Sequence, residues 1–162
     1  MRLAAAIAAA LALALPAAAA PPGAGVLVPG LSLGGLELGA TKAEVERSWG
    51  RAYGVCRGCA RETWYFNYYA FQPRGVGVEW RNGRAVALFT IYQPLGWRTP
   101  KGLELNDPAS RITGIYGPLK TVGCDGYSAL TLNGRSTTTA FYVLGDRLWA
   151  FAISRPGLSL CR

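Results

Sequence analysis

The chain has 162 residues, with 17 Lys and Arg against nine Asp and Glu, and it contains no histidine. This length suits one domain of ordinary size or two small units sharing a sheet. Without histidine the chain has no Ser-His-Asp or Cys-His catalytic site and no histidine-ligated zinc. The net charge of +8 comes mostly from scattered arginines rather than a clustered stripe, so we expect no nucleic-acid partner.

Residues 1–20 have the pattern of a signal peptide. Arg2 is followed by an Ala/Leu-rich apolar run over residues 3–15, and small residues at 18–20 suit a cleavage site. An uncleaved membrane anchor is the alternative, although the run is near the lower length limit for a span. We expect cleavage, a secreted or extracytoplasmic (cell envelope) location, and no membrane span afterwards. The Gly/Pro-rich residues 21–34 are predicted to be a flexible N-terminal segment with at most one short strand.

A sixteen-residue segment occurs twice, at 35–50 (GLELGATKAEVERSWG) and at 102–117 (GLELNDPASRITGIYG). Repetition without gaps indicates one structural unit used twice. Both copies predict a short helix that ends at a glycine. Thr41 and Glu44 form a capping-box pattern in the first copy, and Asp107 is the expected N-cap in the second.

Strand and turn signals follow each predicted helix in the same order. Apolar and aromatic strands are expected at 64–71, 76–80 and 85–92, and again at 127–132, 137–144 and 148–154, with Asn-Gly turns at 82–83 and 133–134. The predicted fold class is therefore α+β. Two tandem helix-plus-antiparallel-meander units, 35–93 and 102–162 with a linker at 94–101, would form a concave sheet with helices on the outer face.

The first repeat also suggests a family. The stretch LGATKAEV at 38–45, closed by Trp49 and Gly50, resembles the opening of SmpA/OmlA (BamE-like) domains. Two such units in tandem in a secreted chain resemble the architecture of the β-lactamase inhibitory proteins. The resemblance implies tandem α/β repeats and, for function, inhibition of an extracellular enzyme.

The four cysteines predict two disulfides, because exported chains are normally oxidised. Three pairings are possible, and we favour Cys56–Cys59 with Cys124–Cys161 because each pair stays within one unit. The CxxC spacing of the first pair is also typical of redox enzymes, where it begins a helix. Here it follows a helix and precedes an aromatic strand, so we expect a structural bridge, with no metal site and no cofactor.

The candidate binding residues come from alternation along one strand. Tyr65, Asn67 and Tyr69 would share a face with Glu79, opposite a core face of Trp64 and Phe66. The alternative is that both faces of this strand are buried. Trp97, in the linker, is either a plug between the two units or a ligand contact.

No arrangement of residues predicts a catalytic site, so we expect a protein that is not an enzyme. The predicted function is a secreted binding module, inhibitor-like in its use of a concave aromatic sheet to hold an unknown protein or envelope polymer. One alternative is a thiol-disulfide oxidoreductase acting through Cys56 and Cys59. The other is a structural component of the cell envelope.

Overall fold

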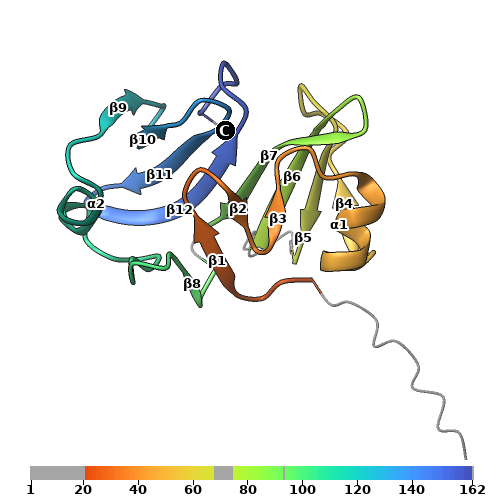
Figure 1. Ribbon diagram of the computed structural model, residues 1–162, viewed down its shortest axis with the longest axis horizontal. Coiled ribbons are helices and arrows are strands. Elements are labelled where there is room, and N and C mark those ends of the chain that lie inside the picture. Colours follow the sequence, from red (N-terminus) through yellow and green to blue (C-terminus); the bar gives the residue numbers. More distant parts are fainter. Residues whose placement is uncertain (1–20, 68–74, 93, 162) are drawn as a thin grey trace, which may run out of the picture.

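The computed structural model describes residues 21–67, 75–92 and 94–161. The predicted signal peptide and the candidate residue Tyr69 lie outside these ranges. Within them the protein is mostly β-structure with two eight-residue helices (Figure 1). The helices are α1 (Lys42–Trp49) and α2 (Ala109–Tyr116). The strands are β1 (Gly25–Val28), β2 (Ser32–Leu33), β3 (Leu36–Glu37), β4 (Tyr53–Val55), β5 (Thr63–Phe66), β6 (Gly75–Arg81), β7 (Arg84–Ile91), β8 (Trp97–Arg98), β9 (Lys120–Gly123), β10 (Ser128–Asn133), β11 (Thr138–Leu144) and β12 (Arg147–Ser154).

The larger sheet has eight strands in the order β4-β5-β6-β7-β12-β11-β10-β9, and every neighbouring pair is antiparallel. β7 and β12 join its two halves through three residue pairs that end at Phe89 and Ala152. Beyond that pair the ladder changes, because the Thr90 hydroxyl accepts the main-chain N–H of Phe151 at 2.8 Å. At the centre of the sheet, the Thr90 hydroxyl thus replaces the main-chain carbonyl that would normally accept this hydrogen bond from the neighbouring strand.

The smaller sheet has four strands in the order β3-β2-β1-β8 and lies against one face of the larger sheet (Figure 1). It includes residues 25–33, so the prediction of a flexible N-terminal segment with at most one strand is wrong for this part. Leu27 and Leu33 are fully buried, and the Gly30 N–H donates to the Thr139 hydroxyl at 2.8 Å. Apolar burial and hydrogen bonds to the larger sheet hold the segment in place.

The predicted α+β fold of two helix-plus-meander units is also wrong. The structure is mostly β, and the segments expected to be flexible or to link the units contribute three of the four strands of a second sheet. Trp97 and Arg98, inside the predicted linker, form β8, which pairs in parallel with β1. Their pairing partner lies about seventy positions earlier in the chain, so a local pattern did not indicate it.

The helix ends follow local chemistry in part. The capping box of α1 is confirmed: the Thr41 hydroxyl accepts from the Glu44 N–H, and the Glu44 carboxylate accepts from the Thr41 N–H at 2.7 Å. The prediction of Asp107 as the N-cap of α2 is wrong, because that position is Pro108, which makes no side-chain cap. The Asp107 carboxylate instead accepts from the Glu104 N–H at 2.8 Å and pairs with Arg111.

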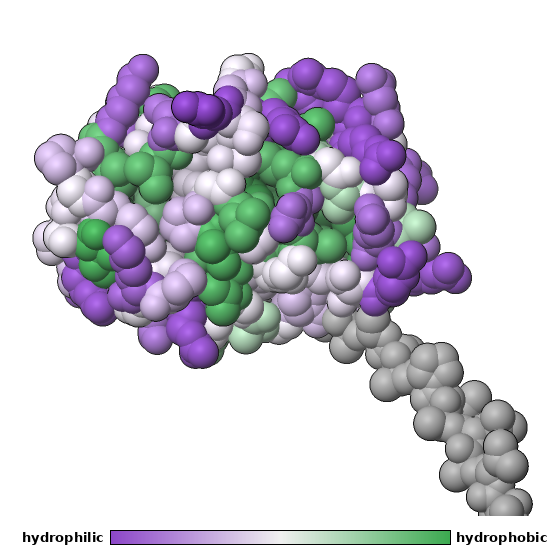
Figure 2. Space-filling view, viewed as in Figure 1, coloured by the Kyte–Doolittle hydropathy of each residue, from purple (hydrophilic) through white to green (hydrophobic). Residues whose placement is uncertain are grey.

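The main core lies between the larger sheet on one side and the helices with the smaller sheet on the other. It contains the fully buried side chains Trp49, Phe66, Trp97, Phe141 and Phe151. Seen from the side of the smaller sheet, hydrophobic residues gather across the middle of the molecule and hydrophilic residues predominate at both ends (Figure 2). This packing leaves the opposite face of the larger sheet for other contacts.

Candidate functional site

The opposite face of the eight-stranded sheet carries a cavity of about 610 Å³. Residues from both halves of the sheet line it: Gly54, Val55, Cys56, Tyr65, Phe89, Thr90, Ile91, Tyr92, Tyr127, Tyr142 and Trp149. Six of these eleven residues are aromatic. The volume falls within the range of ligand sites in proteins, and the predominance of aromatic and apolar surface is typical of them.

Small residues on this face leave room above the sheet. Ala129, Ala140, Ala150 and Ala152 are at most 1% exposed and belong to the cluster of buried side chains that includes Phe89 and Tyr142. A Cβ at Gly77 would collide with the ring of Phe89, so only glycine lets that ring lie down over β6. The hollow therefore results from small side chains in the middle of the sheet with large rings around them.

Trp149 is the centre of one aromatic wall. Its ring centroid lies 5.5 Å from that of Tyr127 at 87°, 5.6 Å from Tyr92 and 6.0 Å from Tyr142. The pair with Tyr127 has the edge-to-face geometry that aromatic rings prefer, and the other two pairs are tilted, at 56° for Tyr92 and 45° for Tyr142. Of the four, Tyr92 is the exposed one at 56%, with a backbone φ of 50° that large side chains rarely adopt. Tyr92 thus forms an exposed rim beside a packed wall.

Tyr65 and Phe89 form the wall on the other side, with ring centroids 6.2 Å apart at 82°. The Tyr65 hydroxyl lies 3.7 Å from the Cys59 sulfur, and because that sulfur is in a disulfide only the hydroxyl can donate. Tyr65 and Cys56 both line the cavity. The loop between β4 and β5, which carries the CxxC, is therefore part of the cavity rim.

The C-terminal segment closes the region next to Tyr142. The Tyr142 hydroxyl donates to the Leu160 carbonyl at 2.7 Å, and Leu160 packs against the same aromatic cluster. Leu158 packs on Val86 and Ala87, and a disulfide joins Cys161 to Cys124. The end of the chain is thus fastened across this face beside the cavity.

No lining residue is charged, and the groups with shifted pKa values lie elsewhere. Near α1, hydrogen bonds from the Lys42 ammonium at 2.7 and 2.8 Å hold the pKa of Glu62 below its ordinary value. The indole N–H of Trp64 also donates to Glu62, at 2.9 Å. Burial, followed by the hydrogen bond to Glu46, raises the pKa of Tyr53. This network holds α1 to β4 and β5, and it does not face a ligand site.

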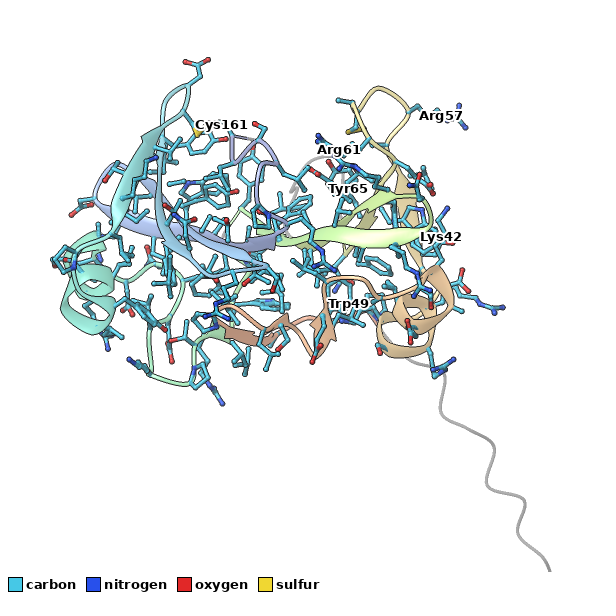
Figure 3. All side chains as sticks on the ribbon, turned by 45° about the horizontal axis from the view of Figure 1, so that its top comes forward. Lys42, Trp49, Arg57, Arg61, Tyr65 and Cys161 are labelled. Carbon is cyan, nitrogen blue, oxygen red and sulfur yellow. A yellow bond between two sulfur atoms is a disulfide. The ribbon has the colours of Figure 1, made fainter. Side chains whose placement is uncertain are left out.

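The five predicted binding residues have different positions. Tyr65 lines the cavity and points above the sheet, whereas Trp49 lies below it (Figure 3). Glu79 is on the same face as Tyr65, with one oxygen 3.7 Å from Arg61. Asn67 follows the end of β5 with a φ of 54° and does not line the cavity. Tyr69 lies outside the described residues.

Trp97, the fifth predicted binding residue, is 1% exposed and belongs to the core on the other face of the sheet. A Cβ at Gly25 or Gly34 would lie 2.9 Å from its ring, so both glycines make room for it. Its position matches the alternative reading of a plug. A ligand would reach this ring only if the core opened.

Sequence reasoning missed most of the cavity. It did not identify Phe89, Tyr92, Tyr127, Tyr142 or Trp149, although all five lie in segments that were predicted to be strands. Alternation along β11 places Tyr142 on the face opposite to the core residues Phe141 and Val143. Trp149 has no partner in the register of β11 and β12, where a bulge falls, so alternation alone does not assign its face. What no pattern indicated is that β7 pairs with β12, which brings the two sets of rings together.

The structure forms both favoured disulfides, Cys56–Cys59 and Cys124–Cys161, and leaves no free cysteine. The first closes the short connection between β4 and β5, where the Cys56 N–H donates to the Thr63 carbonyl at 2.9 Å. In the described ranges, no three Cys, Asp or Glu side chains gather closely enough to hold a metal ion. No helix in those ranges is long and apolar enough to span a membrane.

Neither a protein-family model nor a curated protein matches this chain. Two solved structures are similar. One is a DUF4309 family protein (YjgB) from Bacillus subtilis, with a TM-score of 0.54 and 12% identity over 72% of this chain and 78% of that one. The other is an extracellular protein containing an SCP domain from Bacillus anthracis, with a TM-score of 0.54 and 11% identity over 74% of this chain but only 44% of that one. At these identities the likeness concerns the fold alone, and neither structure is an SmpA/OmlA repeat or a β-lactamase inhibitory protein.

Proposed function

We propose that this protein is an extracytoplasmic, non-enzymatic binding protein that holds its partner in the aromatic cavity of the eight-stranded sheet. The observation that carries the proposal is the cavity itself: about 610 Å³, six aromatic rings and no charged side chain among the lining residues. Aromatic side chains supply large contact area at low conformational cost, and they dominate the residues on which binding energy depends.

The chemistry of the lining favours binding over catalysis. A general acid or base must be within hydrogen-bond reach of the reacting group, and it is usually His, Glu, Asp or Lys. The cavity offers none of these, and the polar groups in its lining are Tyr hydroxyls, the Trp149 indole and Thr90. The Thr90 hydroxyl already accepts from Phe151. Such a lining suits the recognition of apolar surface.

Three observations support a location outside the cytoplasm. The chain has two disulfides, and disulfides form and persist in oxidising environments outside the cytoplasm. One of the two similar solved structures is an extracellular protein. The sequence of residues 1–20 has the signal-peptide pattern.

The second candidate function is thiol-disulfide exchange through Cys56 and Cys59, favoured by the position of Cys56 in the cavity lining and the exposure of Cys59. Against it, the motif joins two strands, and no helix begins there to stabilise a thiolate. Turnover in an insulin-reduction assay that is lost in Cys56→Ser would favour this function. A structural role in the envelope would instead appear as stable co-purification with one envelope complex.

Site-specific photo-crosslinking tests the proposed function. A benzophenone amino acid is placed at Tyr92, on the cavity rim, or at Leu31, which is 51% exposed on the side of the smaller sheet. Both proteins are secreted with their own signal segment and irradiated in the producing culture. We expect one discrete adduct from position 92, weakened by Trp149→Phe, and none from position 31. Equal adducts from both positions, or none from position 92, would contradict the cavity as the binding site.

A further inference from the structure

β4 is an outer strand of the eight-stranded sheet, and among the strands that the structure describes only β5 pairs with it. The Cys56 N–H donates to the Thr63 carbonyl at 2.9 Å, so these two residues form a hydrogen-bonded pair. Such pairs alternate along an antiparallel ladder, which makes the next pair, Val55 with Trp64, a non-bonded one. The N–H and C=O of Val55 therefore point away from β5. Neither group has a partner in the part of the chain that the structure describes.

This outer edge adjoins the aromatic cavity. Gly54, Val55 and Cys56 are part of the cavity lining, and a Cβ added at Gly54 would meet nothing within 4 Å. Gly54 therefore places no side chain between the edge and the cavity. Tyr92, which belongs to the lining, is 56% exposed, so apolar surface continues from the cavity onto its rim. Exposed apolar surface beside a pocket is typical of protein-binding sites.

The two features together select a class of partner. An outward N–H and C=O on an edge strand match the main chain of an extended peptide, which adds to the sheet as a further strand. The uncharged aromatic cavity suits a large apolar side chain, whereas polar ligands need precisely placed polar groups to fix their orientation. A lipid chain would fill the cavity but has no donor or acceptor for the edge.

We propose that β4 and the cavity together bind an extended peptide segment of a partner protein. The segment pairs with the main chain of Val55 and places one aromatic or large aliphatic side chain in the cavity. This inference rests on the proposed function and adds the class of partner and the way it is held. The short length of β4 limits the pairing to a few hydrogen bonds, so the inserted side chain supplies much of the affinity.

Calorimetry on the secreted protein tests this with two probes. One is a blocked pentapeptide with Thr and Val on both sides of a central Phe, and the other is p-cresol, which has a ring but no main chain. Val55→Pro removes the outward N–H and breaks no bond to β5, while Val55→Ala trims the side chain and keeps the N–H. We expect Val55→Pro to weaken the affinity for the pentapeptide about tenfold and to leave the affinity for p-cresol unchanged. Val55→Ala should change the affinity for either probe by about threefold at most.

Further probes keep the result decisive if Val55→Pro folds poorly. A pentapeptide with N-methylated main-chain amides should bind about tenfold more weakly to the unaltered protein, and one with Ala in place of Phe should lose about as much. Equal binding of the plain and N-methylated peptides would overturn the pairing with β4 while leaving cavity binding intact. Binding of decanoate or an N-acetylglucosamine tetramer without the peptide would overturn the peptide as partner. If neither p-cresol nor any other probe binds, the proposed function itself fails.

Discussion

The hydroxyl of Tyr142 donates a hydrogen bond to the main-chain carbonyl of Leu160 at 2.7 Å. A ring of the cavity wall is thereby fastened to the last residues of the chain, which the disulfide from Cys161 to Cys124 holds in place. The shape of the cavity thus depends on a segment that contributes no residue to its lining.

Tyr142→Phe should remove this hydrogen bond without changing the size of the ring. We expect the free energy of unfolding to fall by about 1 kcal/mol, because the Leu160 carbonyl loses its partner in a partly buried place. Urea denaturation measures this change. The matched control is Tyr92→Phe, which removes a hydroxyl from an exposed ring and should change stability by less than about 0.5 kcal/mol. Equal losses in both variants would contradict the role of the Leu160 contact.

The two disulfides should contribute unequally to stability. On the chain-entropy model, closing the loop from Cys124 to Cys161 is worth about 4 kcal/mol, and closing the loop from Cys56 to Cys59 about 2 kcal/mol. We therefore expect the paired serine replacement at 124 and 161 to lower the free energy of unfolding more than the replacement at 56 and 59. Chemical denaturation of both double variants checks the order. A larger loss at 56 and 59 would show that this bridge does more than close a short loop.

Stability should respond to pH through Glu62. Its pKa is lowered in the folded protein, chiefly by the hydrogen bond from Lys42. A lowered folded pKa contributes stability that is fully present above the ordinary value of 4.5 and is lost as pH falls through the folded value. Glu62→Gln should therefore be less stable than the unaltered protein near neutral pH. This difference in stability should shrink once the pH falls below 4.5 and through the lowered pKa of Glu62. Thermal unfolding of both proteins across pH 3 to about 7 tests this. A difference that stays constant with pH would rule out the ionised pair as its source.

Trp97→Ala should separate stability from binding. Trp97 is 1% exposed in the core opposite the cavity, and truncating a buried Trp typically costs about 3–5 kcal/mol. We expect a loss of that order in urea denaturation. Peptide affinity, measured below the unfolding transition, should change less than about twofold, since no cavity ring is removed. A tenfold loss of affinity in still-folded protein would return Trp97 to the candidate binding residues.

The local elements were predictable where neighbouring residues decide the backbone. Asn82 and Gly83 both have positive φ values, and the hairpin predicted there joins β6 to β7. The capping box at Thr41 formed as expected, because its partners are three residues apart. The alternation of Trp64 and Phe66 inward with Tyr65 outward also holds, since the pleat of a strand follows the order of its residues.

The sequence by itself therefore determined the two helices, the turn at Asn82 and Gly83, and the strands β5, β6, β7, β10, β11 and β12, whereas β4 and β9 were not predicted. It also determined the residue types available: cysteines placed for two bridges, many aromatic rings and no histidine. Only the tertiary structure decided that residues 25–33 and 97–98 form a second sheet, because β1 pairs with β8 across a long stretch of chain. It also decided the cavity. Phe89 and Trp149 line one cavity because β7 and β12 pair at the middle of the sheet, and that pairing depends on burial and hydrogen bonding between distant segments rather than on any local preference.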